Sequence, residues 1–189
     1  MITRINNFDS SILLPLNRFF TAHDTFLNKF LAEYLTYSLP LILVILWFWN
    51  EKAKKVALRA SFSAILAWPV FAMIIGKLVH RSRPFSVTGV QELVFHRPDT
   101  SFPSEHAAAL FAVTASLWLS GYRKLAYWML GLSIIISFFR IATGIHWPTD
   151  IFFGIIIGIV SAIIIQLLDK PLNLVYNFLI KIAKLIRIA

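Results

Sequence analysis

The sequence predicts an all-α, polytopic membrane helical bundle with about five transmembrane helices and an interfacial amphipathic helix at each terminus. Of the 189 residues, 58% are hydrophobic and only 14% are charged, whereas a soluble domain has about 45–50% apolar and 25% charged residues. The apolar residues gather in five long stretches, and many Lys and Arg residues stand at the ends of those stretches. This distribution is typical of a polytopic membrane protein.

Each apolar stretch is a candidate span, because crossing the hydrocarbon core takes about 20 helical residues, with about 17 as the lower limit. The first stretch is short and can extend back through Phe26–Glu33. The five stretches are Tyr34–Trp49, Ala60–Val79, Glu105–Tyr122, Leu125–Ala142 and Ile151–Leu168.

The two ends of the chain are less apolar than the middle. Residues 8–20 hold a short apolar group that indicates an interfacial helix, and the N-terminus lacks a signal-peptide cleavage pattern, which indicates mature protein. Residues Leu172–Ile188 alternate basic and apolar side chains at helical spacing, which predicts a basic amphipathic helix on the membrane surface rather than a sixth span. Because no linker or low-complexity tract divides the sequence, we expect residues 1–189 to form one membrane-embedded domain, with the candidate catalytic motifs within residues 77–150.

The positive charge of the chain predicts its orientation. The net charge is +9, which favours anionic lipid headgroups here because no nucleic-acid-binding pattern is present. Basic residues in Glu51–Arg59, Gly121–Lys124 and the tail place those segments on the cytoplasmic side of a bacterial cytoplasmic membrane. The loops His80–Ser104 and Thr143–Asp150 then share the periplasmic or extracellular side. Their own basic residues call for an anionic partner there.

Three local patterns in and beside these two loops suit phosphate chemistry: KLVHRSRPF (Lys77–Phe85), SFPSEH (Ser101–His106) and RIATGIHWPTD (Arg140–Asp150). Arginine binds phosphate oxygens bidentately and keeps its charge, which fits Arg83 and Arg140. Ser104 directly precedes a predicted helix, whose first free N–H groups can bind an anion. Glu105 beside it is expected to point away from the phosphate.

The last pattern supplies a nucleophile. His146 and Asp150 stand four residues apart, and Pro148 between them suits the start of a helix. Asp150 can then accept from one nitrogen of His146, which fixes the tautomer and leaves the other nitrogen to attack phosphorus. His106 is free to act as the general acid. No compact set of metal ligands is present, and cysteine is absent, so we predict a metal-independent reaction without a cofactor.

These residues resemble the type-2 phosphatidic acid phosphatase superfamily, whose signature is a Lys six residues before Arg-Pro, then Pro-Ser-Gly-His, then Ser-Arg with His and Asp at fixed spacing. The matching segments are Arg83-Pro84, Pro103–His106 with Glu105 for Gly, and Arg140, His146 and Asp150 in the third pattern with Phe139 for Ser. The resemblance implies that His146 is the nucleophile, Asp150 its partner and His106 the acid. It further implies that Arg83, Ser104 and Arg140 bind phosphate.

The first motif departs from the family pattern. Position 76, where the lysine is expected, is Gly76, and Lys77 is one residue out of register. Either Lys77 or Arg81 binds phosphate in its place, or the role is vacant. Within the family, the compact length, the run HRPDTSFPSEH and this loosened motif resemble the bacitracin-resistance type of undecaprenyl-diphosphate phosphatase. That type implies hydrolysis of undecaprenyl diphosphate to undecaprenyl phosphate and inorganic phosphate through a phosphohistidine, which recycles the cell-wall lipid carrier and confers bacitracin resistance.

Several alternatives stay open. The phosphate can be carried by phosphatidylglycerophosphate or phosphatidic acid, and the chain can be a non-catalytic lipid-phosphate binder or a transporter. Gly154 and Gly158 form a small-xxx-small step that suits helix packing and allows a homodimer. We interpret His23, His80 and His96 as incidental.

Overall fold

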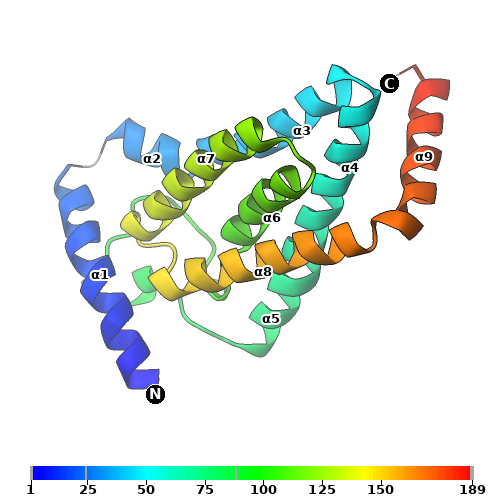
Figure 1. Cartoon of the computed structure of the whole chain (residues 1–189). Coiled ribbons are helices and arrows are strands. Elements are labelled where there is room, and N and C mark those ends of the chain that lie inside the picture. Colours follow the sequence, from blue (N-terminus) through cyan, green and yellow to red (C-terminus); the bar gives the residue numbers. More distant parts are fainter. Residues whose placement is uncertain (1, 24, 88, 188–189) are drawn as a thin grey trace.

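The computed structural model describes residues 2–23, 25–87 and 89–187, and the regular elements in these ranges are all helical (Figure 1). This confirms the predicted all-α bundle. The longer helices are α1 (Ile2–Ala22), α2 (Phe26–Ala32), α3 (Ser38–Trp49), α4 (Glu51–Ile65), α5 (Met73–Leu78), α6 (Glu105–Leu119), α7 (Arg123–Ala142), α8 (Pro148–Leu167) and α9 (Asp169–Leu185). Three short turns are η1 (Tyr34–Tyr37), η2 (Leu66–Ala72) and η3 (Pro84–Ser86).

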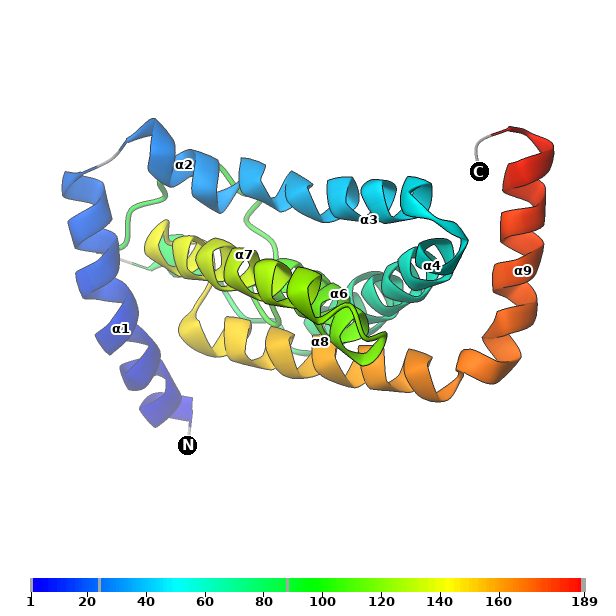
Figure 2. The ribbon, with the colours of Figure 1, turned by 45° about the horizontal axis from the view of Figure 1, so that its top comes forward.

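Helix α6 is the centre of the bundle and packs against α4, α7 and α8 (Figures 1 and 2). Its buried residues are mostly small, and three consecutive alanines begin at Ala107. Gly154 and Gly158 of α8 face them so closely that a Cβ at Gly158 would lie 2.5 Å from the carbonyl oxygen of Ala108. The small-residue stripe that allowed a homodimer is therefore occupied by α6 of the same chain.

Helices α4, η2 and α5 form a continuous helical segment from Glu51 to Leu78. The prediction of a connecting loop over Glu51–Arg59 is wrong, since these residues are the first turns of α4. Asn50 caps this helix by accepting a hydrogen bond from the backbone N–H of Ala53 at 2.9 Å. The following residues, rich in Ala, Lys, Leu and Glu, are strong helix formers. Turn η2 is a π-helical turn around Pro69, whose ring cannot donate a backbone hydrogen bond.

The five predicted stretches are all helical, but they differ in length. By length and composition, three helices can span a membrane: Glu51–Leu78, Arg123–Ala142 and Pro148–Leu167. A fourth span results if Phe26–Ala32 and Tyr34–Trp49, which are bent by 40° at their junction, count together. Helix α6 has only 15 residues. It is enclosed by its neighbours, so most of its surface meets protein rather than lipid.

Both predicted terminal helices are present. Helix α1 packs along α7 and α8, where the amide of the fully buried Asn17 donates to the carbonyl oxygen of Ala142 at 3.0 Å. Helix α9 buries one apolar face, with Tyr176 and Ile180, and leaves its basic residues on the other side. Its predicted end at Ile188 lies outside the described residues. The position of both helices at the membrane surface stays a prediction.

Candidate active site

The two predicted outer loops meet at one end of the bundle. Gly144, with φ +78°, makes the tight turn after α7, and a Cβ there would lie 2.6 Å from the carbonyl oxygen of Gln91. The backbone N–H of Phe85 donates to the carbonyl of Gly144 at 3.1 Å, and that of Leu93 donates to the carbonyl of Thr143 at 3.2 Å. These bonds hold the loop 80–104 against the loop that carries His146.

His146 is buried, with 2% of its surface exposed, and its ring is fixed by a backbone carbonyl. Its Nδ1 lies 2.9 Å from the oxygen of Ser101 and 3.7 Å from Oδ2 of Asp150. Because a carbonyl only accepts, Nδ1 carries the proton and Nε2 keeps its lone pair. The predicted orienting group, Asp150, is therefore the more distant of two partners.

The carboxylate of Asp150 is occupied by other donors, which explains this difference. Its Oδ2 accepts from the backbone N–H of Trp147 at 2.8 Å, at the start of α8, and its Oδ1 accepts from Arg81 at 2.7 Å. Arg81 also donates to Thr149 at 2.7 Å and forms an ion pair with the fully buried Asp9 of α1. Arg81 is thus engaged at the start of α8, and the structure does not bring it to the cavity described below.

The pKa of His146 lies well below its ordinary value of 6.5. Burial is the main cause, and the positive charges of Arg140 and Arg83 add to it, because a buried imidazolium beside two guanidinium groups is unfavourable. The ring is therefore neutral at physiological pH, which is the form in which Nε2 can attack.

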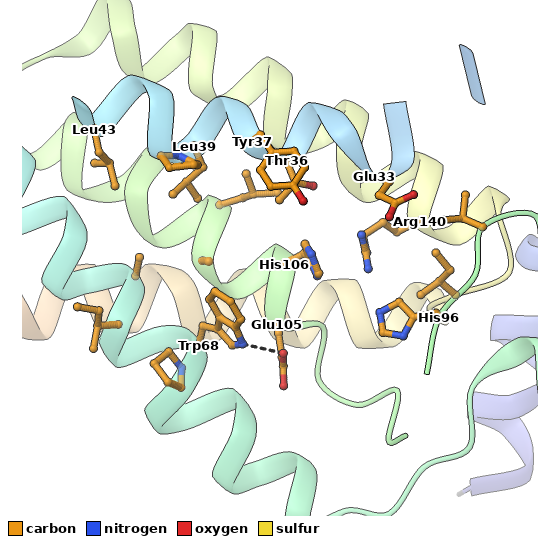
Figure 3. A pocket seen from close by; sticks show the side chains of 18 of the residues that line it. Glu33, Thr36, Tyr37, Leu39, Leu43, Trp68, His96, Glu105, His106 and Arg140 are labelled. Atoms are coloured by element: carbon orange, nitrogen blue, oxygen red, sulfur yellow. Dashed lines mark hydrogen bonds between the residues drawn. The ribbon is translucent and has the colours of Figure 1, made fainter. Parts of the chain in front are cut away.

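A cavity of about 780 Å³ lies between α3, the α4–η2 segment, α6 and α7 (Figure 3). His146 itself does not line it, but the preceding residue Ile145 and His96, whose ring centroid lies 6.4 Å from that of His146, do. Most of its wall is apolar and includes Leu39, Leu43, Ile65, Ala109 and Leu110. Its polar end holds Glu33, His96, His106 and Arg140, which Figure 3 shows near one another, and Arg97 and Glu105 also line the cavity. Such a cavity fits an amphiphile with a charged head and an apolar tail.

Arg140 gives the polar end its anion-binding character. Its side chain is 3% exposed, and one terminal nitrogen donates to the carbonyl of Ala32 at 3.1 Å. Its Nε is buried and has no hydrogen-bond partner among the described residues. A buried donor without a partner is costly, so this guanidinium is suited to a phosphate oxygen.

Arg83 and Ser104 lie close to the site but are held by protein partners. The Nε of Arg83 donates to Asp99 at 2.7 Å and one terminal nitrogen donates to the carbonyl of Ile145 at 3.2 Å. Ser104 caps α6, and its N–H donates to the carbonyl of Asp150 at 3.1 Å. Both residues fix the loops, and Arg83 adds positive charge beside His146.

Lys77 stands away from this cavity. It is exposed and lines a separate hollow of about 190 Å³ with His80 and Thr100. Gly76 is packed so that a Cβ would lie 3.2 Å from the carbonyl oxygen of Phe102, which explains why position 76 holds no side chain. The structure therefore brings neither Lys77 nor Arg81 to the place of the first-motif lysine.

Glu105 is turned away from the histidines. Its Oε2 accepts a hydrogen bond from Nε1 of Trp68 at 2.6 Å, and Figure 3 shows the carboxylate directed away from His106 and Arg140. His106 itself lines the cavity and faces its polar end.

His96, interpreted as incidental from the sequence, lies in the site. It lines the cavity, and its ring centroid is 6.4 Å from that of His146. Two signals in the sequence could have found it: His96 is the first residue of the run HRPDTSFPSEH, and the apolar Val94 two residues earlier is buried against Ala32 and Ile145 and draws this part of the loop inward. The spacing of His96 from the three motifs does not indicate a role in the site.

Comparison with known proteins identifies the family. The model of the PAP2 superfamily matches residues 57–171, which is more than half of the chain. The undecaprenyl-diphosphatase BcrC of Bacillus subtilis is 30% identical over 142 residues, covering 73% of this chain and 72% of that protein. The bacitracin transport permease protein BcrC of Bacillus licheniformis is 28% identical over 151 residues, covering 79% of this chain and 74% of the relative.

Two solved structures share the fold. LpxE of Aquifex aeolicus has a TM-score of 0.63 at 24% identity, covering 82% of this chain and 93% of that one. A PAP2-type phosphatidylglycerolphosphate phosphatase of Bacillus subtilis has a TM-score of 0.61 at 18% identity, covering 89% and 87%. The chain is therefore a multi-span membrane lipid phosphatase and belongs to the PAP2 superfamily.

Proposed function

We propose that the chain hydrolyses undecaprenyl diphosphate to undecaprenyl phosphate and inorganic phosphate through a phosphohistidine at His146. The observation that carries this proposal is the cavity, whose apolar length ends at Arg140, with its unpaired Nε, and at the imidazoles of His106 and His96. His96 in turn lies beside the buried, neutral His146. Two relatives that match most of the chain support the diphosphate as substrate, since one is named an undecaprenyl-diphosphatase and the other a bacitracin transport permease. Recycling of the lipid carrier and bacitracin resistance follow from that substrate.

The reaction proceeds in two steps. In the first, Nε2 of His146 attacks the terminal phosphorus, a nitrogen–phosphorus bond forms and the bond to the bridging oxygen breaks. The negative charge of the bound substrate favours the protonated form of His106, and this imidazolium gives its proton to the leaving oxygen of the lipid monophosphate. In the second step, the oxygen of a water molecule attacks the phosphorus while neutral His106 takes a proton from that water. The nitrogen–phosphorus bond breaks, inorganic phosphate is released and both histidines return to their starting forms.

Positive charge from the protein stabilises the transferring phosphoryl group. Arg140 lines the cavity and has a buried Nε without a hydrogen-bond partner among the described residues. Arg83, which donates to the carbonyl of Ile145, adds its positive charge near His146. Ser104 and Asp150 hold the two helix starts in register. Among the described residues, no three His, Asp or Glu side chains group so that they can hold a metal ion. We propose a metal-independent reaction in which the guanidinium groups stabilise the charge of the phosphoryl group.

We further propose that the site faces the periplasmic or extracellular side of the bacterial cytoplasmic membrane. The basic segments near Lys124 and along α9 lie at the end of the bundle opposite the two loops (Figure 1). The positive-inside rule assigns that end to the cytoplasm.

The proposal is tested with the purified full-length protein in lipid nanodiscs. Phosphate release is measured with undecaprenyl diphosphate, farnesyl diphosphate, phosphatidic acid and phosphatidylglycerophosphate, with and without EDTA. We expect the highest kcat/KM for the polyprenyl diphosphates and no effect of EDTA. A preference for either glycerophospholipid would reassign the substrate, and a loss of activity restored only by added metal would contradict the metal-free reaction.

The covalent step needs its own control. His146→Ala is expected to abolish release while the protein stays folded, and His80→Ala, which changes a loop histidine outside the cavity, is expected to keep full activity. Acid-labile ³²P should be trapped on the wild type and not on His146→Ala. Turnover by His146→Ala at the wild-type rate would rule out the phosphohistidine.

A further inference from the structure

The polar end of the cavity has fewer donors than a phosphate normally receives. Lys77 and His80 line another hollow, and Arg81 is held by Asp9 and Asp150. Phe139, in place of the family's serine, packs against an apolar cluster that includes Ala32 and has no hydroxyl to offer. The donors left at the cavity are the buried Arg140, the exposed Arg97 and the imidazoles, so the family's first-motif lysine and third-motif serine have no counterpart there.

His96 is placed to fill this deficit. Its backbone N–H donates to Oε1 of Glu92 at 2.6 Å, which fixes the turn of the loop. Its ring stands beside His106 and Arg140 at the polar end of the cavity (Figure 3) and 6.4 Å from the ring of His146. A phosphate between Arg140 and His146 therefore has His96 within reach.

The imidazole of His96 has one nitrogen available. Its Nδ1 lies 3.3 Å from the carbonyl oxygen of Arg97, so the proton of the neutral ring is on Nδ1. Nε2 has no partner among the residues that the structure describes, and it becomes a donor only when the ring is protonated. A bound phosphate would favour that protonation.

We propose that His96 is a phosphate-binding residue of this site, taking the place of the first-motif lysine and donating from Nε2 to the substrate as an imidazolium. This inference rests on the proposed function. It assigns to the diphosphate a ligand that none of the family's three motifs contains.

The charges around His96 agree with an imidazole that becomes protonated when phosphate binds. Burial, and then the charges of Arg83 and Arg140, lower the pKa of His96, while Asp99 opposes them. Glu33 and Glu105 also line the cavity, on the side of α2 and α6. A phosphate that carries two negative charges offsets the two guanidinium groups and makes the imidazolium favourable.

The test compares His96→Ala, His96→Gln and His96→Lys with His80→Ala as the matched control. With farnesyl diphosphate in nanodiscs, His96→Ala should raise KM by about 10- to 100-fold with kcat little changed, as expected for one charge-assisted hydrogen bond. His96→Lys should recover most of this loss and His96→Gln only part of it. In the wild type KM should rise with pH as the imidazolium is lost, and His96→Lys should weaken that dependence.

A binding measurement separates this inference from the proposed function. The affinity of the nonhydrolysable methylenediphosphonate is measured by calorimetry for the wild type, His96→Ala and His80→Ala. Weaker binding by His96→Ala alone supports the inference, even if no lipid in the substrate panel is hydrolysed. Equal affinities, or a His96→Ala protein that differs from His80→Ala only in kcat, would overturn it.

Discussion

A methyl group added at Gly154 of α8 should push α8 away from α6 and so separate the two parts of the site. A Cβ added there would lie 2.7 Å from the carbonyl oxygen of Ser104 and 2.8 Å from the Cβ of Ala107. Neither neighbour is the flexible end of a long side chain. Reaching ordinary van der Waals contact at about 3.4 Å requires α6 and α8 to part by roughly 0.7 Å.

The cost of Gly154→Ala can be bounded from these distances. Overpacking of a tight contact costs about 1–3 kcal/mol, and the better helix propensity of alanine returns about 0.8–1 kcal/mol. The free energy of unfolding should therefore fall by about 0–2 kcal/mol. Catalysis should suffer more, because His106 lies in the first turn of α6 and His146 lies two residues before the start of α8, and a displacement near 1 Å can cost about 100-fold. We expect kcat to fall by about 10- to 100-fold.

Gly131 provides the matched control. It lies in α7, and a Cβ there meets nothing within 4 Å. Gly131→Ala should keep full activity and leave stability unchanged or raised by about 0.5–1 kcal/mol. Unfolding is followed by circular dichroism during titration with SDS in mixed micelles, and kcat by phosphate release. If Gly154→Ala matched Gly131→Ala in both measurements, the tight α6–α8 contact would not govern the site.

Three further predictions concern the ion pairs, the proton and the orientation. Asp9→Ala should lower the free energy of unfolding by about 3–5 kcal/mol, since Asp9 is fully buried and also accepts from the N–H of Thr149 at 2.9 Å; a loss below about 1 kcal/mol in the SDS titration would contradict this. Arg83→Gln removes a charge that lowers the pKa of His146, so the acid limb of kcat/KM against pH should move to higher pH. In the wild type, His146 stays neutral below its ordinary pKa of 6.5, and activity is lost only as the pH falls through the lowered pKa. Without the charge of Arg83 that pKa rises, so activity is lost at a higher pH. An acid limb that does not move would show that Arg83 does not lower the pKa of His146. The chain has no cysteine, so Ser86→Cys should react with an impermeant maleimide from outside intact cells and Lys124→Cys only after lysis, whereas the reverse pattern would invert the orientation.

The sequence predicts the helices well because apolar length is a local property. Residues 51–59 are the main exception. Basic residues beside an apolar stretch suggest a loop, but here Asn50 caps the helix and the strong helix formers after it make these residues the first turns of α4. The span count also differs, since α6 is short for a span and its neighbours rather than lipid enclose it. Hydropathy does not register that kind of enclosure.

The candidate site was only partly predictable. The motif spacing identifies His146 and Asp150, but the carbonyl of Ser101 that fixes Nδ1 is a backbone group and leaves no mark in the sequence. Arg81 and Lys77 are both candidate phosphate ligands by sequence, and only the positions of Asp9 and of the cavity separate them from Arg140. Such pairings join residues far apart along the chain, so periodicity and spacing carry little information about them.

The cavity has a consequence for how the reaction is driven. A volume of about 780 Å³ holds a phosphate head and the first part of a long tail. With the proposed substrate, the rest of the undecaprenyl chain would therefore remain dissolved in the bilayer. The rate then depends on the mole fraction of substrate in the plane of the membrane rather than on its bulk concentration. The two products also part into different phases, because the lipid monophosphate stays in the membrane while inorganic phosphate diffuses into water. Dilution of the phosphate makes the reverse reaction negligible, and turnover proceeds in one direction without any other energy source.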